Sequence, residues 1–335
     1  MLDKYQIKQN SNGGNLMIRF SGYKVTEEIY NSENSKIFRA NRESDNAPVV
    51  IKLLNREYPS ANELSAFIRE YEIMNKVTQE GIIKAYSLEK YNNSLAIIME
   101  DIGAESVAKV LKSFNAGINE KLSLAIQMTN VLIQLHKHNI VHKDVNPSNF
   151  IWNINTNQVK IIDFGISAEL MRESSQSINL NKLEGTLNYI SPEQTGRINR
   201  PIDYRTDLYS LGITFYELFT GKLPFHGDDE LEIIYSHIAK RPISPIDINP
   251  EIPSVLSEII MKLMAKTAEE RYQSAFGLMK DLELCKKLLN EKKIISRFIP
   301  GQRDIFERFE IPHKLYGREA EIKMLGKAFE RAAYG

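Results

Sequence analysis

Two neighbouring segments of the sequence carry oxygen-bearing side chains that one folded site could share. Asp144 and Asn149 lie in VHKDVNPSN, and Asp163 follows an apolar run in VKIIDFG. The apolar runs 150–154 and 159–162 flank the turn-like residues NTNQ, which predicts a β-hairpin. Because the two ends of an antiparallel hairpin lie side by side, we expect Asn149 and Asp163 to meet beside Asp144. Two oxygen ligands there suit a hard cation such as Mg²⁺, which shares substrate phosphates, and Asp144 is left to orient a nucleophile.

The hydrophobic pattern of the sequence divides the chain into two regions of different predicted structure. Between residues 22 and 100 short apolar runs surround one helical period at 62–77, which predicts a small lobe of five strands and one helix. Beyond residue 100 the pattern becomes mostly helical. The expected fold class is therefore α+β, with a small, mostly-β lobe ahead of a large, mostly-helical one. The candidate helices of the second lobe are 121–138, 206–220, 230–239, 255–265 and 275–289.

Composition narrows the class of protein. The 335 residues contain 43 Lys and Arg and 43 Asp and Glu, so the formal net charge is zero and a dominant nucleic-acid or anionic-membrane surface is not expected. The single cysteine, Cys285, has no partner for an intramolecular disulfide and lies in a helical pattern that predicts a packed thiol. The chain has no apolar stretch of the roughly 18 residues that a spanning helix needs. We expect a cytoplasmic protein without membrane insertion and without a nucleic-acid partner.

The two motifs together resemble the catalytic loop and the metal-binding loop of eukaryotic-type (Hanks-type) serine/threonine protein kinases. The resemblance implies a two-lobed kinase fold and transfer of the γ-phosphate of ATP to Ser or Thr hydroxyls of protein substrates. It implies that Asp144 orients the substrate hydroxyl, and that Asn149 and Asp163 hold Mg²⁺, or Mn²⁺ in its place, against the phosphates. His136 and His142 are expected to be structural.

The same resemblance assigns residues on the nucleotide side. Lys52, in the β-branched run 49–54, matches the strand lysine that binds the non-transferred phosphates. Its ionic partner is expected to be Glu70, aligned on the apolar pair that follows it, with Glu72 as the alternative. Backbone groups of the interlobe connection should bind adenine, with one side chain at the back of the pocket. The residues concerned are Glu100 and Ile102 for the backbone contacts and Met99 for the back of the pocket.

The glycine-rich loop expected before Ile37 contains no glycine. Tyr30, Ser32 and Ser35 occupy the three glycine positions, and Ser32, Ser35 and Ile37 are still expected to line the nucleotide site. Side chains there crowd the approach to phosphate, and any positive φ becomes more costly. We therefore expect weaker or slower use of the nucleotide.

Asn146 is a second departure, because the serine/threonine pattern has a lysine there that reaches the γ-phosphate. The asparagine can donate a hydrogen bond at the catalytic centre but supplies no positive charge; Lys143 and Arg205 are candidate replacements. These losses leave a second hypothesis open, that of a pseudokinase acting as a nucleotide-binding regulatory or scaffolding module.

The segment 185–193, GTLNYISPE, resembles the end of a protein-kinase activation segment and argues for a protein substrate. Thr186 fits the serine/threonine pattern. The resemblance implies a buried ion pair between Glu193 and Arg271, and it implies that Asp207 ties down the catalytic loop.

Serines ahead of this segment are candidate regulatory sites. Phosphorylation of Ser174, Ser175 or Ser177 would add negative charge and could order the loop against Lys143. A polar, flexible loop with incidental serines is the alternative.

Residues 291–335 are predicted to be a linker and the truncated start of a downstream module. The segment IPHKLYGRE and the apolar positions Ile322, Leu325, Phe329 and Ala332 resemble the opening of AAA-like signalling ATPases. GTLNYISPEQTGRINR and KTAEERYQSA resemble kinases at the head of large bacterial multidomain sensors, so further domains of a longer protein are expected partners. A helical extension packing on the kinase is the alternative. The predicted divisions are a lead-in at 1–21, lobes at 22–100 and 101–290, and the tail at 291–335.

Overall fold

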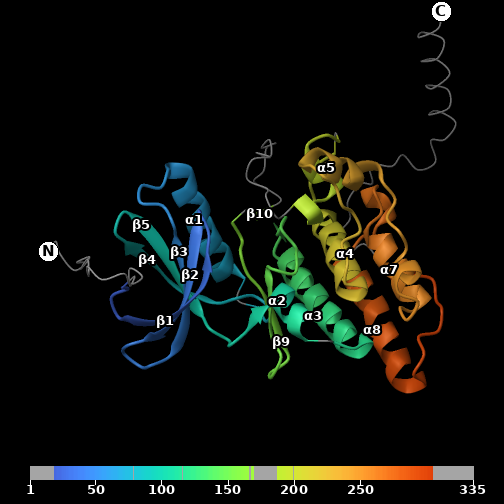
Figure 1. The fold of residues 1–335 in the computed structure, drawn as a ribbon, viewed down its shortest axis with the longest axis horizontal. Coiled ribbons are helices and arrows are strands. Elements are labelled where there is room, and N and C mark those ends of the chain that lie inside the picture. Colours follow the sequence, from blue (N-terminus) through green and yellow to red (C-terminus); the bar gives the residue numbers. More distant parts are fainter. Residues whose placement is uncertain are drawn as a thin grey trace, which may run out of the picture. The chain divides into compact units, whose positions relative to one another are not determined.

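The structure of the chain is a computed structural model that describes residues 19–77, 79–114, 116–165, 167–169, 187–198 and 200–304. The chain divides into two compact units, Met1–Asp304 and Ile305–Gly335. All the elements named below belong to the first unit (Figure 1). Within the described residues, every helix is too short or too polar to cross a membrane.

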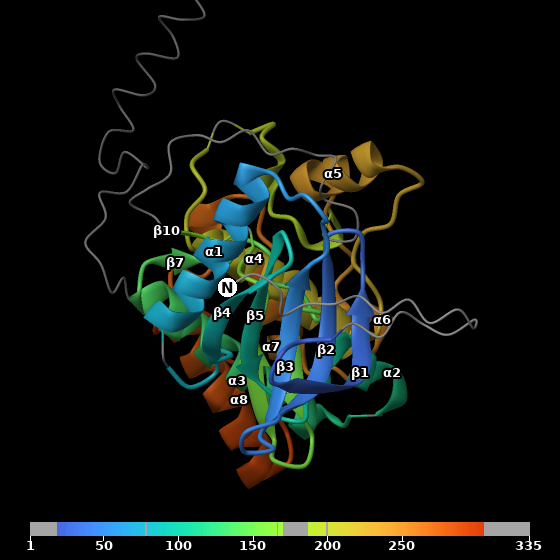
Figure 2. The same cartoon turned by 90° about the vertical axis from the view of Figure 1, so that its left-hand side faces the viewer.

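The N-terminal lobe is one antiparallel sheet with a helix beside it, as predicted. The strands stand in the order β1-β2-β3-β5-β4, and α1 packs against β4 and β5 (Figure 2). Helix α1 begins at Ser60, whose side chain and that of Glu63 form a capping box, and it turns Phe67, Ile73 and Met74 inward. The elements are β1 Tyr23–Asn31, β2 Ser35–Arg42, β3 Pro48–Leu54, α1 Ala61–Lys76, β4 Ala85–Tyr91 and β5 Ser94–Glu100.

The C-terminal lobe is mostly helical and is organised around α4, whose side chains are almost all buried. Helix α7 lies so close to α4 that a Cβ on Gly212 would come within 2.7 Å of Leu263 Cβ. The helices are α2 Val107–Ser113, α3 Ile118–Lys137, α4 Arg205–Thr220, α5 Glu230–Ala239, α6 Pro245–Ile248, α7 Ser254–Leu263 and α8 Ala275–Lys292, with short 3-10 turns η2 Leu187–Tyr189, η3 Pro192–Thr195 and η4 Ala268–Glu270.

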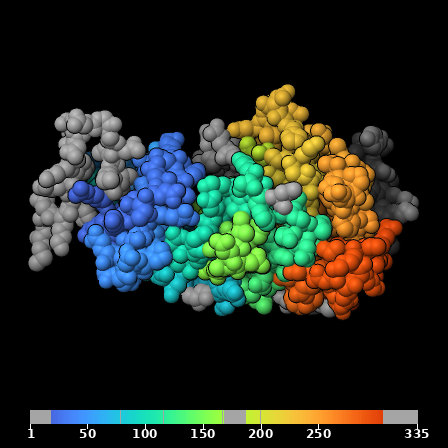
Figure 3. Space-filling view, turned by 60° about the horizontal axis from the view of Figure 1, so that its bottom comes forward, coloured from blue at the N-terminus to red at the C-terminus, as the bar shows by residue number. Residues whose placement is uncertain are grey.

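The predicted hairpin is present where the two lobes meet. Strand β8, Phe150–Asn153, pairs antiparallel with β9, Gln158–Ile161, and β6, Glu105–Ser106, pairs with β8. A second small pairing joins β7, Ile140–Val141, to β10, Ala168–Glu169. Figure 3 shows the hairpin, in light green, at the surface between the N-terminal lobe and α8.

The chain after α8 folds back over the helical lobe. Ile295 is buried, Gly301 N donates to Asp281 Oδ2 at 2.6 Å, and Asp304 Oδ1 accepts from Ser274 Oγ at 2.8 Å. The compact unit therefore reaches Asp304, beyond the division predicted at residue 290. The downstream module itself lies outside the described residues and stays a prediction.

Candidate functional site

Lys52 lies on β3 and meets carboxylates from two other elements. Its Nζ is 2.6 Å from Glu70 Oε1 on α1 and 3.0 Å from Asp163 Oδ1, which follows β9. Glu70 follows Phe67 by three positions, so it shares the helix face that packs on the sheet and is buried with it. Glu72 points away from that face and is exposed. Of the two candidate glutamates, the structure thus brings Glu70 to Lys52.

Lys52 and Asp163 stabilise each other's charge, whereas burial and the nearby Asp163 charge raise the pKa of Glu70. Burial by itself would lower the pKa of the Lys52 ammonium, but the charges of Asp163 and Glu70 outweigh burial and raise that pKa above its ordinary value. The Lys52 charge in turn lowers the pKa of Asp163, against the effect of burial. At neutral pH the site therefore holds a fixed ammonium beside an ionised Asp163 carboxylate.

Asp144 is held by two side-chain amides of its own loop. Asn149 Nδ2 donates to Asp144 Oδ2 at 2.8 Å, and Asn146 Nδ2 donates to Asp144 Oδ1 at 2.9 Å. Burial raises the pKa of Asp144, and the nearby Asp163 charge raises it further, whereas His142 and the two amides lower it. The carboxylate is thus oriented through both oxygens, with a pKa above the ordinary aspartate value.

The Asn146 side chain is used entirely within the loop. In addition to its bonds to Asp144, its Oδ1 accepts hydrogen bonds from Ser148 N at 2.9 Å and Asn149 N at 3.3 Å. The sequence pattern had placed Asn146 where a lysine meets the transferred phosphate, and this bracing role was missed. The Asn-Pro dipeptide, which favours a side-chain-capped turn, was the available signal.

Asn149 and Asp163 lie together at the open end of the hairpin, as predicted. Ile162 N donates to Asn149 O at 2.9 Å. This hydrogen bond places Asn149 beside the segment that leads into Asp163. Among the described residues, no protein group donates to Asn149 Oδ1 or Asp163 Oδ2, because the contacts of these side chains use the other atoms. An amide oxygen and a carboxylate oxygen are hard donors that fit Mg²⁺ or Mn²⁺.

The loop ahead of Asp144 is anchored by Asp207 at the start of α4. Asp207 Oδ1 accepts from Lys143 N at 2.8 Å, and Oδ2 accepts from His142 N and lies 2.9 Å from His136 Nε2. Lys143 has a φ of 68°, a left-handed conformation that costs a non-glycine residue energy. The carboxylate offsets this cost by holding the Lys143 amide in place.

His142 is placed for structure rather than proton transfer. Its Nδ1 accepts from Asp144 N at 3.3 Å, its Nε2 lies 3.2 Å from Ile162 O, and its ring packs edge-on against Phe164. With Nδ1 accepting from Asp144 N, Nε2 is the ring nitrogen that donates to Ile162 O.

Glu193 and Arg271 form the expected buried ion pair. Two guanidinium nitrogens of Arg271 lie 2.6 and 2.8 Å from the Glu193 carboxylate oxygens, and Thr206 Oγ1 also donates to Glu193. Next to it, Gln194 Nε2 donates to Lys143 O at 2.8 Å, so this segment is tied to the catalytic loop. Thr186, Ser174, Ser175 and Ser177 lie outside the described residues.

The residues of the connection between the lobes that were expected to contact adenine lie at and just after the end of β5. Met99 is buried at the end of β5. The Glu100 side chain turns away to accept hydrogen bonds from Lys160 Nζ and Lys84 N, and Asn153 Nδ2 donates to Ile102 O at 2.6 Å. The connection is thus fixed against the hairpin by side chains that sequence reasoning did not identify.

The glycine-free turn between β1 and β2 adopts an unstrained backbone. None of Tyr30, Ser32 and Ser35 has a positive φ. Ile37 pairs with Lys52 across β2 and β3, so the turn stands over the end of the sheet that carries the lysine. The expected cost of positive φ does not arise.

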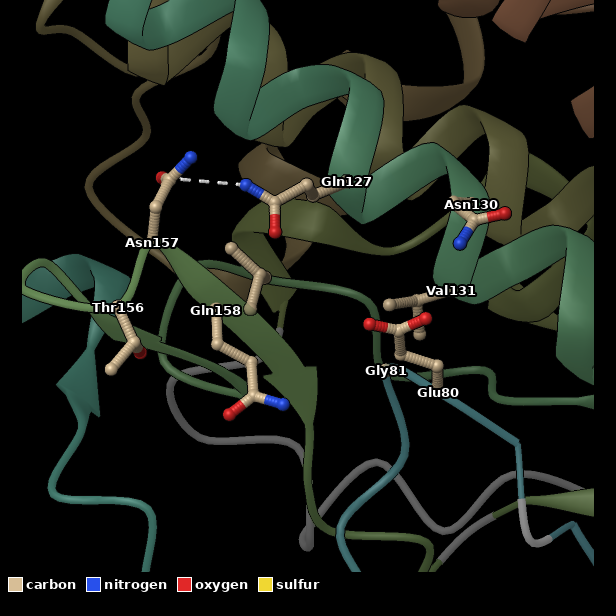
Figure 4. Close-up of a pocket in the computed structure, with 9 residues that line it drawn as sticks. Glu80, Gly81, Gln127, Asn130, Val131, Thr156, Asn157 and Gln158 are labelled. Atoms are coloured by element: carbon tan, nitrogen blue, oxygen red, sulfur yellow. Dashed lines mark hydrogen bonds between the residues drawn. The ribbon is translucent and has the colours of Figure 1, made fainter.

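A separate pocket of about 440 Å³ lies behind the hairpin, between α3 and the segment that leads into β4 (Figure 4). Gln127 Nε2 and Asn157 Oδ1 face each other across it at 3.5 Å. None of the candidate site residues lines this pocket.

Comparison with known proteins agrees with this geometry. Residues 23–283 match the family model for the protein kinase domain. A probable serine/threonine-protein kinase of Clostridium acetobutylicum is 33% identical over 285 residues, which cover 84% of this chain and 42% of that protein. A second, from Clostridium perfringens, is 32% identical over 79% of this chain and 38% of its own length. Hybrid signal transduction histidine kinase G of Dictyostelium discoideum is 30% identical over 65% of this chain and 9% of its own length. The chain spans about two fifths of the clostridial relatives.

Proposed function

This chain belongs to the protein kinase family, and from that premise we propose that it transfers the γ-phosphate of ATP to Ser or Thr hydroxyls of protein substrates. The observation that carries the proposal is the convergence of four groups from three separate segments of the chain. Lys52 from β3 contacts Asp163 from the end of the hairpin, and Asp144 is oriented by Asn149. Positioning and charge neutralisation supply almost all the catalysis in phosphoryl transfer, and this arrangement provides both.

Each group has one task in the proposed reaction. Lys52 binds the non-transferred phosphates and is itself held by Glu70. Asn149 and Asp163 hold a divalent cation, Mg²⁺ or Mn²⁺, which neutralises charge on the phosphates when bound. Asp144 accepts a hydrogen bond from the substrate hydroxyl, orients its oxygen for in-line attack and takes its proton.

The nucleotide is proposed to lie between the lobes. The backbone of Glu100 and Ile102 contacts adenine, Met99 closes the back of the pocket, and the turn with Ser32 and Ser35 covers the phosphates, with Ile37 beneath. The side-chain anchors of this connection support a fixed orientation of its backbone.

Substrate selection and regulation are proposed for the segment before η3. Thr186 supports a preference for Ser and Thr, and Glu193 with Arg271 anchors the end of the segment. Phosphorylation of Ser174, Ser175 or Ser177 is proposed to order the loop against the region of Lys143. The chain is proposed to act in the cytoplasm as one module of a longer signalling protein, as the partial coverage of its relatives supports.

The test is transfer of radiolabelled phosphate from ATP and Mg²⁺ to the chain itself and to a generic basic protein. Asp144→Asn and Asp163→Asn are each expected to lower the rate by about a hundredfold or more. Asp45→Asn, which alters an exposed pair with Arg42 and an exposed hydrogen bond from Ala47 N, is the matched control and should leave the rate unchanged.

The same assay separates the kinase from the pseudokinase. If the wild-type chain transfers no phosphate while ATP still raises its melting temperature, the proposal fails and the chain is a nucleotide-binding module. Transfer that persists in Asp163→Asn would point to a contaminating kinase.

A further inference from the structure

The turn between β1 and β2 is closed by its own serines. Ser32 N donates to Ser35 O at 2.9 Å, while Ser32 Oγ accepts from Ser35 N and donates to Ser35 O, each at 3.1 Å. In the protein kinase family this turn covers the nucleotide phosphates and is rich in glycine. Here the serine hydroxyl replaces flexible glycines with a hydrogen-bonded closure that needs no positive φ.

Asn55, the first residue after β3, clamps the turn from outside. Its side-chain Nδ2 donates to Ser32 O at 2.7 Å, and its backbone N donates to Asn34 O at 2.9 Å. One residue therefore contacts the turn at two separate carbonyls. Because Asn55 follows β3 directly, these two hydrogen bonds fix the position of the turn relative to the strand that carries Lys52.

Arg56 extends the clamp to α1. It donates to Asn34 Oδ1 at 3.1 Å and pairs with Glu33 Oε1 at 2.9 Å in the turn. It also lies 3.4 Å from Glu63, which caps the start of α1. The turn is thus connected to both elements that hold the Lys52–Glu70 pair.

We propose that Asn55 is a positioning residue for the nucleotide phosphates, which holds the Ser32–Ser35 turn in one preformed conformation. The inference rests on the proposed use of ATP. A turn that is already ordered loses less conformational entropy when it closes on a ligand, so bracing from outside compensates for side chains that crowd the phosphates. Loss of the brace should weaken contacts with phosphate and leave contacts with the base intact.

The experiment compares the full chain with Asn55→Ala. We expect KM for ATP, and the Kd of a non-hydrolysable ATP analogue measured by calorimetry, to rise roughly five- to tenfold. The Kd of adenosine should change less than twofold, and kcat should change less than KM. Asn41→Ala is the matched control, because Asn41 lies on β2 and its amide donates only to the side chain of Asn46; all four quantities should keep their wild-type values.

Three results would overturn the proposal: an unchanged affinity for the ATP analogue, an equal loss of adenosine affinity, or a fall in kcat with KM unchanged. If Asn55→Ala does not fold, Arg56→Met probes the same turn through exposed contacts. It should raise the Kd of the ATP analogue and leave the Kd of adenosine unchanged. The binding measurements are independent of transfer. Failure of the proposed kinase activity would therefore appear as a wild-type chain that transfers no phosphate. Failure of this inference would appear in the Kd values of Asn55→Ala for the ATP analogue and for adenosine, each compared with the wild-type value.

Discussion

Replacing Arg271 by methionine should be among the most destabilising single changes in the chain. The Arg271 side chain has no exposed surface, and it gives two hydrogen bonds to Glu193. Arg271→Met leaves the buried Glu193 carboxylate with Thr206 as its side-chain donor and removes the donor from three backbone carbonyls. Those carbonyls belong to Ala265, Arg205 and Lys266. Removing one partner of a buried ion pair costs about 4 kcal/mol, because the remaining charge stays desolvated.

The assay is urea unfolding at pH 7, followed by circular dichroism. With a slope of about 3 kcal/mol per molar urea, a loss of about 4 kcal/mol lowers the midpoint by about 1.3 M. Arg42→Met removes an exposed ion pair with Asp45 and a contact over the Tyr86 ring, and should change the free energy of unfolding by less than about 0.5 kcal/mol. A second change, Glu193→Met, in the Arg271→Met background should recover much of the loss, because it removes the unpaired charge.

The pH dependence of the destabilisation caused by Arg271→Met provides an independent check. Burial would raise the pKa of Glu193, but hydrogen bonds from Arg271 and its charge hold that pKa below the ordinary glutamate value of 4.5. A group with a lowered folded-state pKa stabilises the fold fully above its unfolded-state pKa, and the contribution is lost as pH falls through the folded value. The loss in free energy of unfolding caused by Arg271→Met should therefore be largest at pH 7 and become smaller as the pH falls. A cost below 1 kcal/mol at pH 7, or a double variant no more stable than the single one, would show that Arg271 does not neutralise a buried Glu193 charge.

Three further experiments test other parts of the protein. Glu70→Gln should lower kcat/KM for ATP by about tenfold or more, because Lys52 loses a charged hydrogen bond, whereas Glu72→Gln should leave steady-state kinetics unchanged. Asn146→Ala removes an amide that lowers the pKa of Asp144, so the acid limb of the kcat–pH profile should move to higher pH; an unmoved limb would contradict the assignment of Asp144 as proton acceptor. Burial raises the pKa of Cys285 to about 12, so the folded chain should not react with a thiol reagent at pH 8 and should titrate one thiol in urea; reaction of the folded chain would show that α8 is not packed as described.

The two lobes and the hairpin could be predicted because their signals are local. The run 49–54 is β-branched and apolar, and β3 occupies Pro48–Leu54. The turn residues NTNQ separate two apolar runs that form β8 and β9, and β9 already begins at Gln158, the last residue of the turn sequence. Hydrophobic period and turn chemistry act within a few residues, so a single sequence displays them.

The bracing contacts could not be predicted because they join segments that are distant in sequence and carry no motif. Asn55 meets Ser32 across 23 positions, and Lys160 meets Glu100 across 60. Nothing in the type or spacing of these residues distinguishes them from surface polar residues. The return of the chain to Ser274 and Asp281 was missed for the same reason, since a Pro-Gly segment was interpreted as a linker.

The two departures from the family pattern act on different steps. The glycine-free turn has no positive φ at its three altered positions and is held by a hydrogen bond from Asn55. We therefore expect little loss of affinity for the nucleotide phosphates. The missing cation at Asn146 has no such compensation from Arg205, whose guanidinium donates to both oxygens of Asp203 and to Gln273. Unless Lys143 supplies the cation, charge that develops on the transferred group is stabilised less, and electrostatic stabilisation at that point acts on the transition state rather than on the bound nucleotide. The altered residues should accordingly lower kcat more than they raise KM for ATP.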